Sequence, residues 1–426
     1  MNKQHIVIIG GGFAGVNLSR SLANSPYYHI TLVDRNNYNF FPPLIYQVAS
    51  SYLQISNVTL PFRTLFKKQH NLDFLMGELE RVDPANKTVY LSSGKLQYDK
   101  LVIAAGTDTN FFGNENLKKY ALCMKNLDDA LYMKKCLLNN FELAASATNE
   151  DEIRERLTIL IAGGGPSGVE LSGIMAEYNN TLFAHDFRSL AQRGFRLDIH
   201  LVDGSTSLLK AMSEKAQTTA LKALEKAGVQ VHFKKRVQDY NGQEVFLDTG
   251  EVIRARQLVW TTGVTVKTIE GFNEEIYGGG NRLLVDAYNR LIGYEDIYAI
   301  GDICLQKSDE NYPDGHPQLA QVAIQQGKNL AKNLVNITKG KTLHPFSYYD
   351  KGTMAIVGKS IAVADLPKPK WSFSGFFAWL LWLFIHLMFL VSYRNRIRTF
   401  FEWMASYFSK DKPFRYIIDE SKKINQ

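Results

Sequence analysis

Two glycine-rich loops, each placed between a buried strand and a helix, constrain this 426-residue chain more than any other feature. The first follows a predicted strand at His5–Ile9, opens a predicted helix from Val16 to about Ala23, and is followed by a strand that ends at Asp34; its GxGxxG glycines are Gly10, Gly12 and Gly15. Such glycines let the backbone approach a pyrophosphate, the helix N-terminus stabilises its charge, and the acid accepts hydrogen bonds from the adenosine ribose. We therefore predict a dinucleotide site at the start of the chain.

The same pattern recurs near the middle of the chain. A predicted strand at Leu157–Ala162 precedes a second loop, and a later strand at Leu197–Val202 ends at Asp203; the loop glycines are Gly163, Gly165 and Gly168. The 35 residues that separate Gly168 from Asp203 exceed the usual spacing of about 20. We therefore expect an extended helix or an inserted turn around Asn179–Arg193.

Two dinucleotide loops in one chain indicate an enzyme that moves electrons between a flavin and a nicotinamide. Leu101–Gly106 and Leu258–Gly263 are predicted as strands that return the chain beneath each nucleotide, and Asp296–Gly301 as a strand that ends at Asp302. The Gly301–Asp302 pair resembles a flavin motif in which the aspartate binds the ribityl hydroxyls of FAD; a helix cap or turn acid is the alternative. The predicted fold is α/β, with two Rossmann-like domains of the glutathione-reductase-like flavoprotein type and a membrane-anchoring C-terminal helical region.

The three cysteines limit the chemistry further. Cys123, Cys136 and Cys304 form no CxxC motif and no close pair, so we predict neither a metal site nor a redox-active dithiol, and we expect a reducing compartment. The apolar run before the first glycines has only four residues, too short for a signal peptide, which favours a cytosolic start. Without a dithiol, electrons must leave the flavin directly for an external acceptor.

Three further segments indicate that acceptor. Phe40–Ala49, Ala320–Gln325 with its AQxAxQ pattern, and Tyr349–Ala355 resemble the type II NADH:quinone oxidoreductases, as does the aromatic C-terminal stretch. The resemblance covers nearly the whole chain. It implies FAD-dependent oxidation of NADH, two-electron reduction of a membrane quinone (menaquinone or ubiquinone) to quinol in a respiratory chain, and no proton pumping.

The resemblance also assigns residues. It implies that Glu170 and Gln321 are catalytic, with Glu170 near the nicotinamide and flavin and Gln321 beside the flavin and quinone head. Non-covalent FAD is assigned to Gly10, Gly12, Phe13, Ala14, Gly15, Asp34, Arg35, Ala105, Gly106, Gly301, Asp302, Leu319, Ala320 and Gln321. NADH is assigned to Gly163, Gly165, Pro166, Ser167, Gly168, Glu170, Asp203 and Gly263, and quinone to Tyr46, Gln47, Gln321 and Gln325. The alternative for the AQxAxQ helix is close helix packing through its small residues, with the glutamines on a solvated or capping face.

The C-terminal end combines apolar and basic residues. Phe373–Tyr393 carries no charge, while the chain from Pro367 onward has ten Lys/Arg against four Asp/Glu. Basic residues flank the apolar stretch on both sides, which disfavours translocation under the positive-inside rule. A second, amphipathic helix is predicted from apolar residues at helical spacing, namely Ile397, Phe400, Phe401, Met404, Tyr407 and Phe408. We expect in-plane attachment to an anionic lipid surface rather than nucleic-acid binding; a dimer or core-packing face is the alternative for the second helix.

The predicted domains are a FAD-binding domain in two parts (1–115 and 285–345), an NAD(H)-binding domain (116–284) and a membrane-association region (346–426). A homodimer at the cytoplasmic face of the cell membrane is expected. Two alternatives stay open at this point: a soluble NADH:ferredoxin-type reductase of the same fold, and a non-catalytic, NAD-responsive flavoprotein that docks on membranes.

Overall fold

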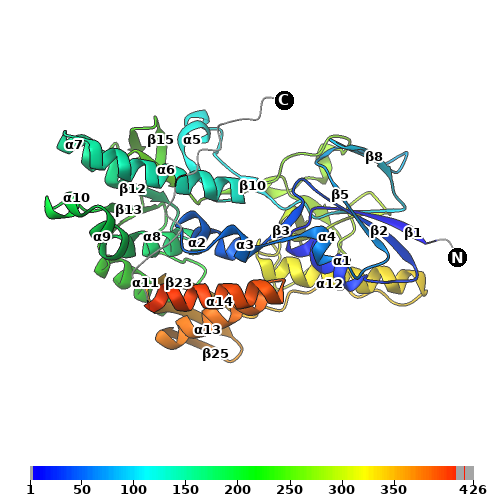
Figure 1. Cartoon of the computed structure of the whole chain (residues 1–426). Coiled ribbons are helices and arrows are strands. Elements are labelled where there is room, and N and C mark those ends of the chain that lie inside the picture. The colour runs from blue at the N-terminus through cyan, green and yellow to red at the C-terminus, as the bar shows by residue number, and fades with distance from the viewer. Residues whose placement is uncertain (1–2, 409–416, 418–426) are drawn as a thin grey trace. The chain divides into compact units, whose positions relative to one another are not determined.

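The computed structural model describes residues 3–408 and residue 417 (Figure 1). The chain forms two compact units, each assembled from three segments. Unit 1 comprises the chain up to Phe40, Thr59–Asp108 and Val264–Asp350; unit 2 comprises Phe41–Val58, Thr109–Gly263 and the chain from Lys351 onward.

Unit 1 is built on a parallel sheet with the strand order β21-β9-β1-β2-β5. The strands span β1 Gln4–Ile9, β2 Tyr28–Asp34, β5 Leu72–Met76, β9 Lys100–Ile103 and β21 Ile297–Ala299. Because successive side chains of a strand point to opposite faces, Ile6 and Ile8 belong to one core and Val7 and Ile9 to another. A sheet covered on both faces explains why these strands are continuously apolar.

Helices pack on one face of this sheet and an antiparallel sheet packs on the other. Helices α1 (Phe13–Ser21) and α12 (Ala320–Thr338) contribute Leu18 and Leu330 to the core that contains Ile6. The antiparallel sheet of β6 Leu79–Asp83, β7 Thr88–Leu91 and β8 Gly94–Gln97 contributes to the opposite core. Shorter elements of the unit are β3 Tyr38–Phe40, β4 Thr59–Pro61, α4 Phe62–Leu65, β20 Leu283–Val285 and β22 Cys304–Gln306.

Unit 2 repeats the plan with the parallel order β11-β18-β12-β13-β14. The strands span β11 Leu122–Cys123, β12 Thr158–Ala162, β13 Asp198–Asp203, β14 Val229–Phe233 and β18 Gln257–Trp260. One core joins this sheet to the antiparallel strands β15 Val237–Tyr240, β16 Glu244–Leu247 and β17 Val252–Arg254. The larger helices of this part are α6 Leu127–Ser146, α7 Glu150–Leu157, α8 Pro166–Tyr178 and α11 Glu214–Lys226. The prediction of two Rossmann-like domains is confirmed.

The long spacing before Asp203 has the predicted cause. Helix α8 continues into a π-helical turn at Asn179–Phe183, followed by α9 Ala184–Asp186 and α10 Arg188–Gln192, before β13 begins. Several predicted boundaries need correction. The strands predicted at 101–106, 258–263 and 296–301 end at Ile103, Trp260 and Ala299. Helix α1 begins at Phe13 rather than Val16 and ends at Ser21. The tight glycine turn leads into the helix without an intervening segment.

The C-terminal part packs as an antiparallel sheet followed by two helices. The strands are β23 Thr353–Gly358, β24 Ile361–Pro367 and β25 Lys370–Gly375, and the helices are α13 Phe376–Phe389 and α14 Tyr393–Phe408. The uncharged stretch Phe373–Tyr393 is therefore divided, because its first three residues complete β25 and α13 ends before Leu390. Across residues 3–408 and 417, no helix combines the length and apolar character that crossing a bilayer requires. The Lys and Arg residues from position 410 onward, counted above toward the basic C-terminal end, lie outside the described residues.

The division by contacts differs from the division by nucleotide that the sequence suggests. Phe41–Val58, which includes η1 Pro42–Leu44, α2 Ile45–Ala49 and α3 Ile55–Val58, belongs to unit 2 although it interrupts the first nucleotide-binding segment. Helix α2 packs on α6 and α8, and α3 packs on α14. The C-terminal sheet and helices belong to the same unit, since α8 packs on β23.

Candidate active site

The two glycine loops have the same geometry. A Cβ on the third glycine of either loop, Gly15 or Gly168, would lie 1.9 Å from the carbonyl oxygen of the first, so helix and strand approach each other too closely for any side chain. A Cβ on the middle glycine, Gly12 or Gly165, would meet no protein atom within 4 Å. The middle position is therefore open to a ligand in both loops, as close approach of a pyrophosphate requires.

The carboxylates that follow each loop hold it in place. Asp34 accepts hydrogen bonds from the backbone N–H of Gly11 (2.7 Å) and of Asn36 (2.8 Å), and burial raises the pKa of this carboxyl group. Asp203 accepts from Gly164 (2.5 Å) and from Ser205 (2.7 Å). Despite its longer spacing, Asp203 thus stands in the same relation to its loop as Asp34 does to the first.

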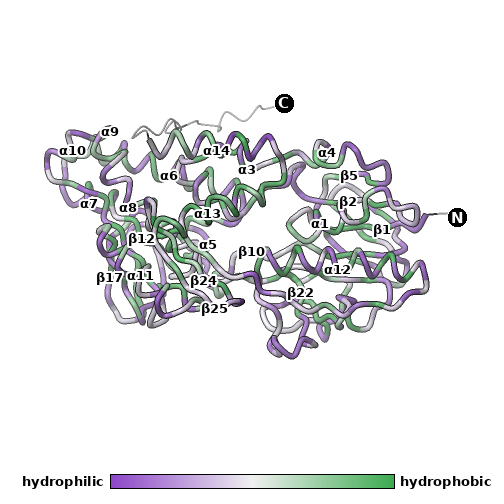
Figure 2. The backbone as a smooth tube through the Cα atoms, turned by 90° about the horizontal axis from the view of Figure 1, so that it is seen from below, coloured by the Kyte–Doolittle hydropathy of each residue, from purple (hydrophilic) through white to green (hydrophobic). Residues whose placement is uncertain are grey.

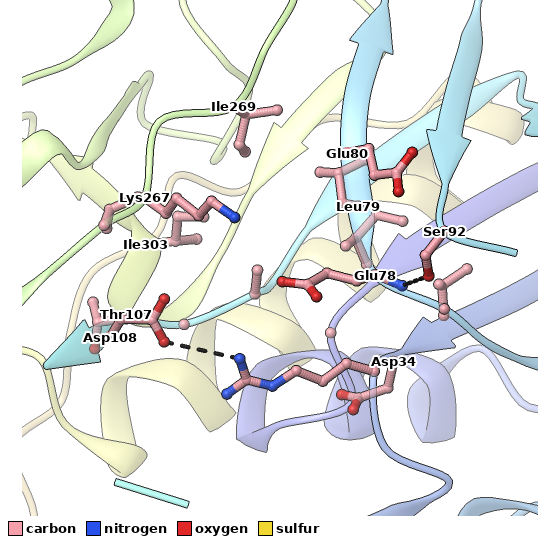
Figure 3. Close-up of a pocket in the computed structure, with 18 of the residues that line it drawn as sticks. Asp34, Glu78, Leu79, Glu80, Ser92, Thr107, Asp108, Lys267, Ile269 and Ile303 are labelled. Carbon is pink, nitrogen blue, oxygen red and sulfur yellow. Dashed lines mark hydrogen bonds and ion pairs between the residues drawn. The ribbon is translucent and has the colours of Figure 1, made fainter. Parts of the chain in front are cut away.

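A cavity of about 460 Å³ opens beside the first loop (Figure 3). Five of the residues predicted for FAD line it, namely Gly10, Asp34, Arg35, Ala105 and Gly106. The side chains of Lys267 and Glu78 extend into it from opposite sides. Arg35 and Asp108 also line it, with the Nη1 atom of Arg35 4.0 Å from the Oδ1 atom of Asp108. Its volume falls in the range typical of ligand pockets. No motif in the sequence marks Lys267 or Glu78 as lining residues, so both were missed.

The Gly301–Asp302 turn is brought to the start of α1. Gly301 has φ +80°, and a Cβ there would lie 3.2 Å from the Cβ of Ala14, which the sequence assigns to FAD. The N–H of Gly301 donates to the Oε1 atom of Gln326 at 2.7 Å. Asp302 is half-buried. Gln326 was not predicted as a site residue, although it fixes this turn from within α12.

Helix α12 positions the predicted glutamines differently. The Tyr348 hydroxyl lies 3.5 Å from the Oε1 atom of Gln321. The carboxamide of Gln325 instead pairs with the backbone of Tyr349, donating to its carbonyl oxygen (2.9 Å) and accepting from its N–H (3.1 Å). Gln325 therefore holds the backbone at Tyr349, which precedes β23, and its assignment to quinone stays a prediction. Leu319 is the N-cap residue of this helix and Ala320 its first residue.

The small residues of α12 also behave as the packing alternative anticipated. A Cβ on Gly327 would lie 2.6 Å from the carbonyl oxygen of Ala14 in α1. Close packing of α1 and α12 therefore accounts for Gly327, while Gln321 and Gln325 make different contacts.

In unit 2, Glu170 lies buried in α8, two residues after Gly168. Its Oε1 atom accepts a hydrogen bond from the N–H of Ile356 in β23 at 3.3 Å. The indole N–H of Trp382 in α13 lies close to the same carboxyl group without a hydrogen bond of good geometry. Burial outweighs these contacts and raises the pKa of Glu170 from 4.5 to about 8. The side chain is thus mostly protonated at neutral pH.

Tyr46 and Gln47 of α2 belong to the same buried region. The charge of Glu170 contributes, after burial, to raising the pKa of Tyr46 well above its usual value. The Nε2 atom of Gln47 donates to the Tyr46 hydroxyl at 3.2 Å, and its Oε1 atom accepts from the indole N–H of Trp403 in α14 at 2.8 Å. Trp382 and Trp403 were not predicted as site residues, because in the sequence they are two more aromatic residues of an apolar tail.

The remaining residues predicted for NADH lie around the second loop. Pro166 and Ser167 form the first turn of α8, where a proline at the first helical position leaves no unsatisfied N–H. Gly263 has φ +76° and its carbonyl oxygen accepts from the N–H of Asn110. In the portion of the chain that the structure describes, no group of three His, Cys, Asp or Glu residues is placed to hold a metal ion.

Helices α13 and α14 run side by side (Figure 1). Figure 2 colours much of α13 as hydrophobic and α14 as a mixture of hydrophobic and hydrophilic residues. Phe377 is 79% exposed, Phe384 61% and Phe401 65%. The polar residues Asn395 and Thr399 of α14 are buried instead. The two helices therefore expose large apolar side chains although α14 buries polar ones, which marks an interaction surface.

Comparison with known proteins agrees with this geometry. The family model described as pyridine nucleotide-disulphide oxidoreductase matches residues 4–327, and the model described as NDH2 C-terminal domain matches residues 350–410. Two proteins of Mycobacterium tuberculosis, the type II NADH:quinone oxidoreductases NdhA and Ndh, are 32% and 31% identical. The alignments cover 96% and 98% of this chain and 88% and 91% of theirs.

Solved structures show the same fold. The structure of NDH2 from Plasmodium falciparum in complex with NADH superposes with a TM-score of 0.89 at 22% identity, covering 98% of this chain and 100% of that one. The sulfide:quinone oxidoreductase of Aquifex aeolicus gives a TM-score of 0.71 at 20% identity, over 96% of each chain. Sequence identity over nearly the full length of the mycobacterial proteins, with both family models matched in order, shows that the chain belongs to the type II NADH:quinone oxidoreductase family.

Proposed function

We propose that this chain oxidises NADH and reduces a membrane quinone to quinol without pumping protons, with FAD held non-covalently in unit 1 and NADH in unit 2. The observation that carries this proposal is the duplicated loop, in which a middle glycine faces open space and an acid holds the loop from the next strand. FAD, when bound, supplies the two-electron carrier between NADH and quinone. No protein nucleophile is needed.

The residues of unit 1 fit an adenine dinucleotide. The cavity beside Gly10 offers Asp34 at the position where a ribose is usually held, together with the positive charges of Arg35 and Lys267. In the proposed site, the N-terminus of α1 stabilises the pyrophosphate and Asp302 binds the ribityl chain. Gln326 keeps Gly301 in the conformation that brings Asp302 to this helix end.

Quinone reduction consumes two protons, and unit 2 contains protonated groups that suit their delivery. Glu170 holds a proton at neutral pH because burial raises its pKa to about 8. A general acid works best when its pKa lies near the operating pH. In this proposal Glu170 holds and passes a proton, and Tyr46 and Gln47 bind the quinone head; the assignment of Gln321 to the flavin and quinone stays a prediction.

The exposed face of α13 and α14 is proposed to lie in one leaflet of the membrane. Its aromatic residues would enter the acyl region, while Arg394 and Arg398, both exposed on α14, would meet anionic headgroups. This arrangement gives a lipid-soluble quinone a short path to the protein. Attachment at the cytoplasmic face and assembly as a homodimer are parts of the same proposal.

Steady-state NADH oxidation separates this function from its alternatives. Purified protein is assayed with a quinone, with ferredoxin, and without acceptor. Rapid turnover with quinone alone supports the proposal; turnover with ferredoxin alone would indicate the soluble reductase, and no turnover with either would indicate a non-catalytic flavoprotein.

Flotation with vesicles tests the membrane face. Replacing Phe377, Phe384 and Phe401 together by Ser should release the protein from vesicles that contain anionic lipid, while Tyr132→Ser, which removes a similarly exposed aromatic residue from α6, should not. Equal binding of both variants would contradict in-plane attachment through α13 and α14.

A further inference from the structure

A hydrogen bond links the last described helix to the buried pair Tyr46–Gln47. The Nε1 atom of Trp403 in α14 donates to the Oε1 atom of Gln47 in α2 at 2.8 Å, across 356 positions of the sequence. Gln47 is 5% exposed and Tyr46 2% exposed. A helix whose outer face is apolar is thus connected, through its inner face, to residues proposed for quinone.

The chemistry of the indole ring fixes the orientation of the Gln47 amide. An indole N–H can only donate, so the atom of Gln47 that faces Trp403 must be the carbonyl oxygen. The amide nitrogen is then turned toward Tyr46, whose hydroxyl oxygen accepts from it at 3.2 Å. If the amide were reversed, two donors would face each other at Trp403.

This orientation determines what the Tyr46 hydroxyl can still do. Its oxygen is occupied by the Gln47 N–H, and burial with the charge of Glu170 raises its pKa well above the usual value, so it keeps its proton. Within residues 3–408 and 417, the structure provides no acceptor for that proton. Leaving the proton of a buried hydroxyl without an acceptor destabilises the folded protein. The unmade hydrogen bond indicates an oxygen of a ligand.

We propose that Trp403 is a positioning residue for quinone reduction: by orienting the Gln47 amide, it directs the Tyr46 hydroxyl to donate to a carbonyl oxygen of the quinone head. The inference rests on the proposed function. It gives α14 a second role beyond attachment, because quinone reduction depends on the inner face of this helix being docked on α2.

Anchoring of α14 does not depend on the same hydrogen bond. The ring of Trp403 packs 6.0 Å from that of Trp382, and Asn395 and Thr399 are buried on the inner face. Trp403→Phe keeps an aromatic ring at this site and removes only the donor. Trp379→Phe in α13 is the matched control, because among the described contacts Trp379 makes ring contacts with Phe376 and Tyr407 but no side-chain hydrogen bond.

The test measures the two half-reactions of the full-length holoenzyme by stopped flow, with NADH as reductant and a short-chain, water-soluble benzoquinone as oxidant. The short chain removes any effect of membrane partitioning. Trp403→Phe should slow flavin reoxidation by the quinone about tenfold and leave flavin reduction by NADH within about twofold of wild type. Trp379→Phe should leave both half-reactions within about twofold.

A double-mutant cycle identifies the route of the effect. If Trp403 acts through Gln47, Trp403→Phe should slow reoxidation little further in a protein that already carries Gln47→Leu. Three results would each overturn the inference. The two substitutions could slow reoxidation by factors that multiply in the double variant, Trp403→Phe could slow both half-reactions equally, or Trp403→Phe could leave both unchanged. A wild-type protein that quinone fails to reoxidise would refute the proposed function itself, which distinguishes the two failures.

Discussion

Replacing Glu170 by Gln should stabilise the folded protein, and increasingly so as pH rises. Gln keeps the shape of the side chain and an oxygen that can accept from the Ile356 N–H. Burial raises the pKa of Glu170 from 4.5 in an exposed setting to about 8, so the folded protein binds this proton more tightly than the unfolded chain. By linkage, stability then falls as pH rises from 4.5 to 8.

The size of the effect follows from that shift. At about 1.4 kcal/mol per pKa unit, burying a carboxyl group with a pKa of about 8 at pH 7 costs about 3 kcal/mol relative to pH 4.5. The cost levels off above pH 8, where the side chain is ionised in both states. The neutral amide of Glu170→Gln has no such pH-dependent cost, so its advantage over wild type should grow by at most about 1.4 kcal/mol per pH unit between pH 5 and 8, most steeply near pH 6.

Urea unfolding followed by tryptophan fluorescence at pH 5, 6, 7 and 8 measures this difference. Glu225→Gln, an exposed carboxylate on α11, provides a control whose stability relative to wild type should change little with pH. A stability difference for Glu170→Gln that is constant over this range would refute the argument, because it would mean that Glu170 is ionised in the folded protein throughout.

Three further outcomes follow from the loops and from α12. Asp34→Ala should weaken FAD retention, measured by flavin release on gel filtration, because both the Gly11 N–H and the ribose lose their acceptor; full occupancy would overturn the assignment of this loop. NADH should be preferred over NADPH, because Asp203 repels a 2′-phosphate; equal kcat/KM values would place another residue at the ribose. Gln321→Ala should slow flavin reoxidation by quinone more than flavin reduction by NADH, and equal loss in both would give Gln321 a purely structural role.

The nucleotide-binding parts of the fold could be predicted because their constraints are local. Each loop, its two flanking strands and its acid lie within a short stretch of sequence, and their geometry is dictated by glycines that no other residue can replace. The one irregular feature, the spacing before Asp203, was also visible as a count of residues. It is filled by helical turns between α8 and β13 that leave the carboxylate beside Gly164.

The surroundings of the predicted catalytic residues could not be predicted in the same way. Glu170 owes its raised pKa to burial under β23 and α13, elements that begin more than 180 residues later in the chain. Neither Ile356 nor Trp382 carries a sequence signal, since one contributes a backbone N–H and the other belongs to an apolar run. Gln325 and Gln326 show the converse limit: only Gln325 belongs to the AQxAxQ motif, yet the two adjacent glutamines of α12 bind a backbone segment and a glycine turn respectively.

Hydropathy alone could not predict the role of the C-terminal helices, because each helix has an exposed apolar side and a side that packs on buried polar groups. The uncharged stretch before Tyr393 suggests lipid on all sides, yet α13 buries Trp382 beside Glu170 while exposing Phe377 and Phe384. Helix α14 likewise directs Trp403 to Gln47 while exposing Phe401. Each helix therefore joins an exposed apolar surface to a buried polar group of unit 2. A truncation that removes them would disturb the environment of Glu170 together with attachment, because β25 and α13 follow one another directly. Substitutions confined to the outer face separate the two roles, since they leave both indole rings where the structure has them.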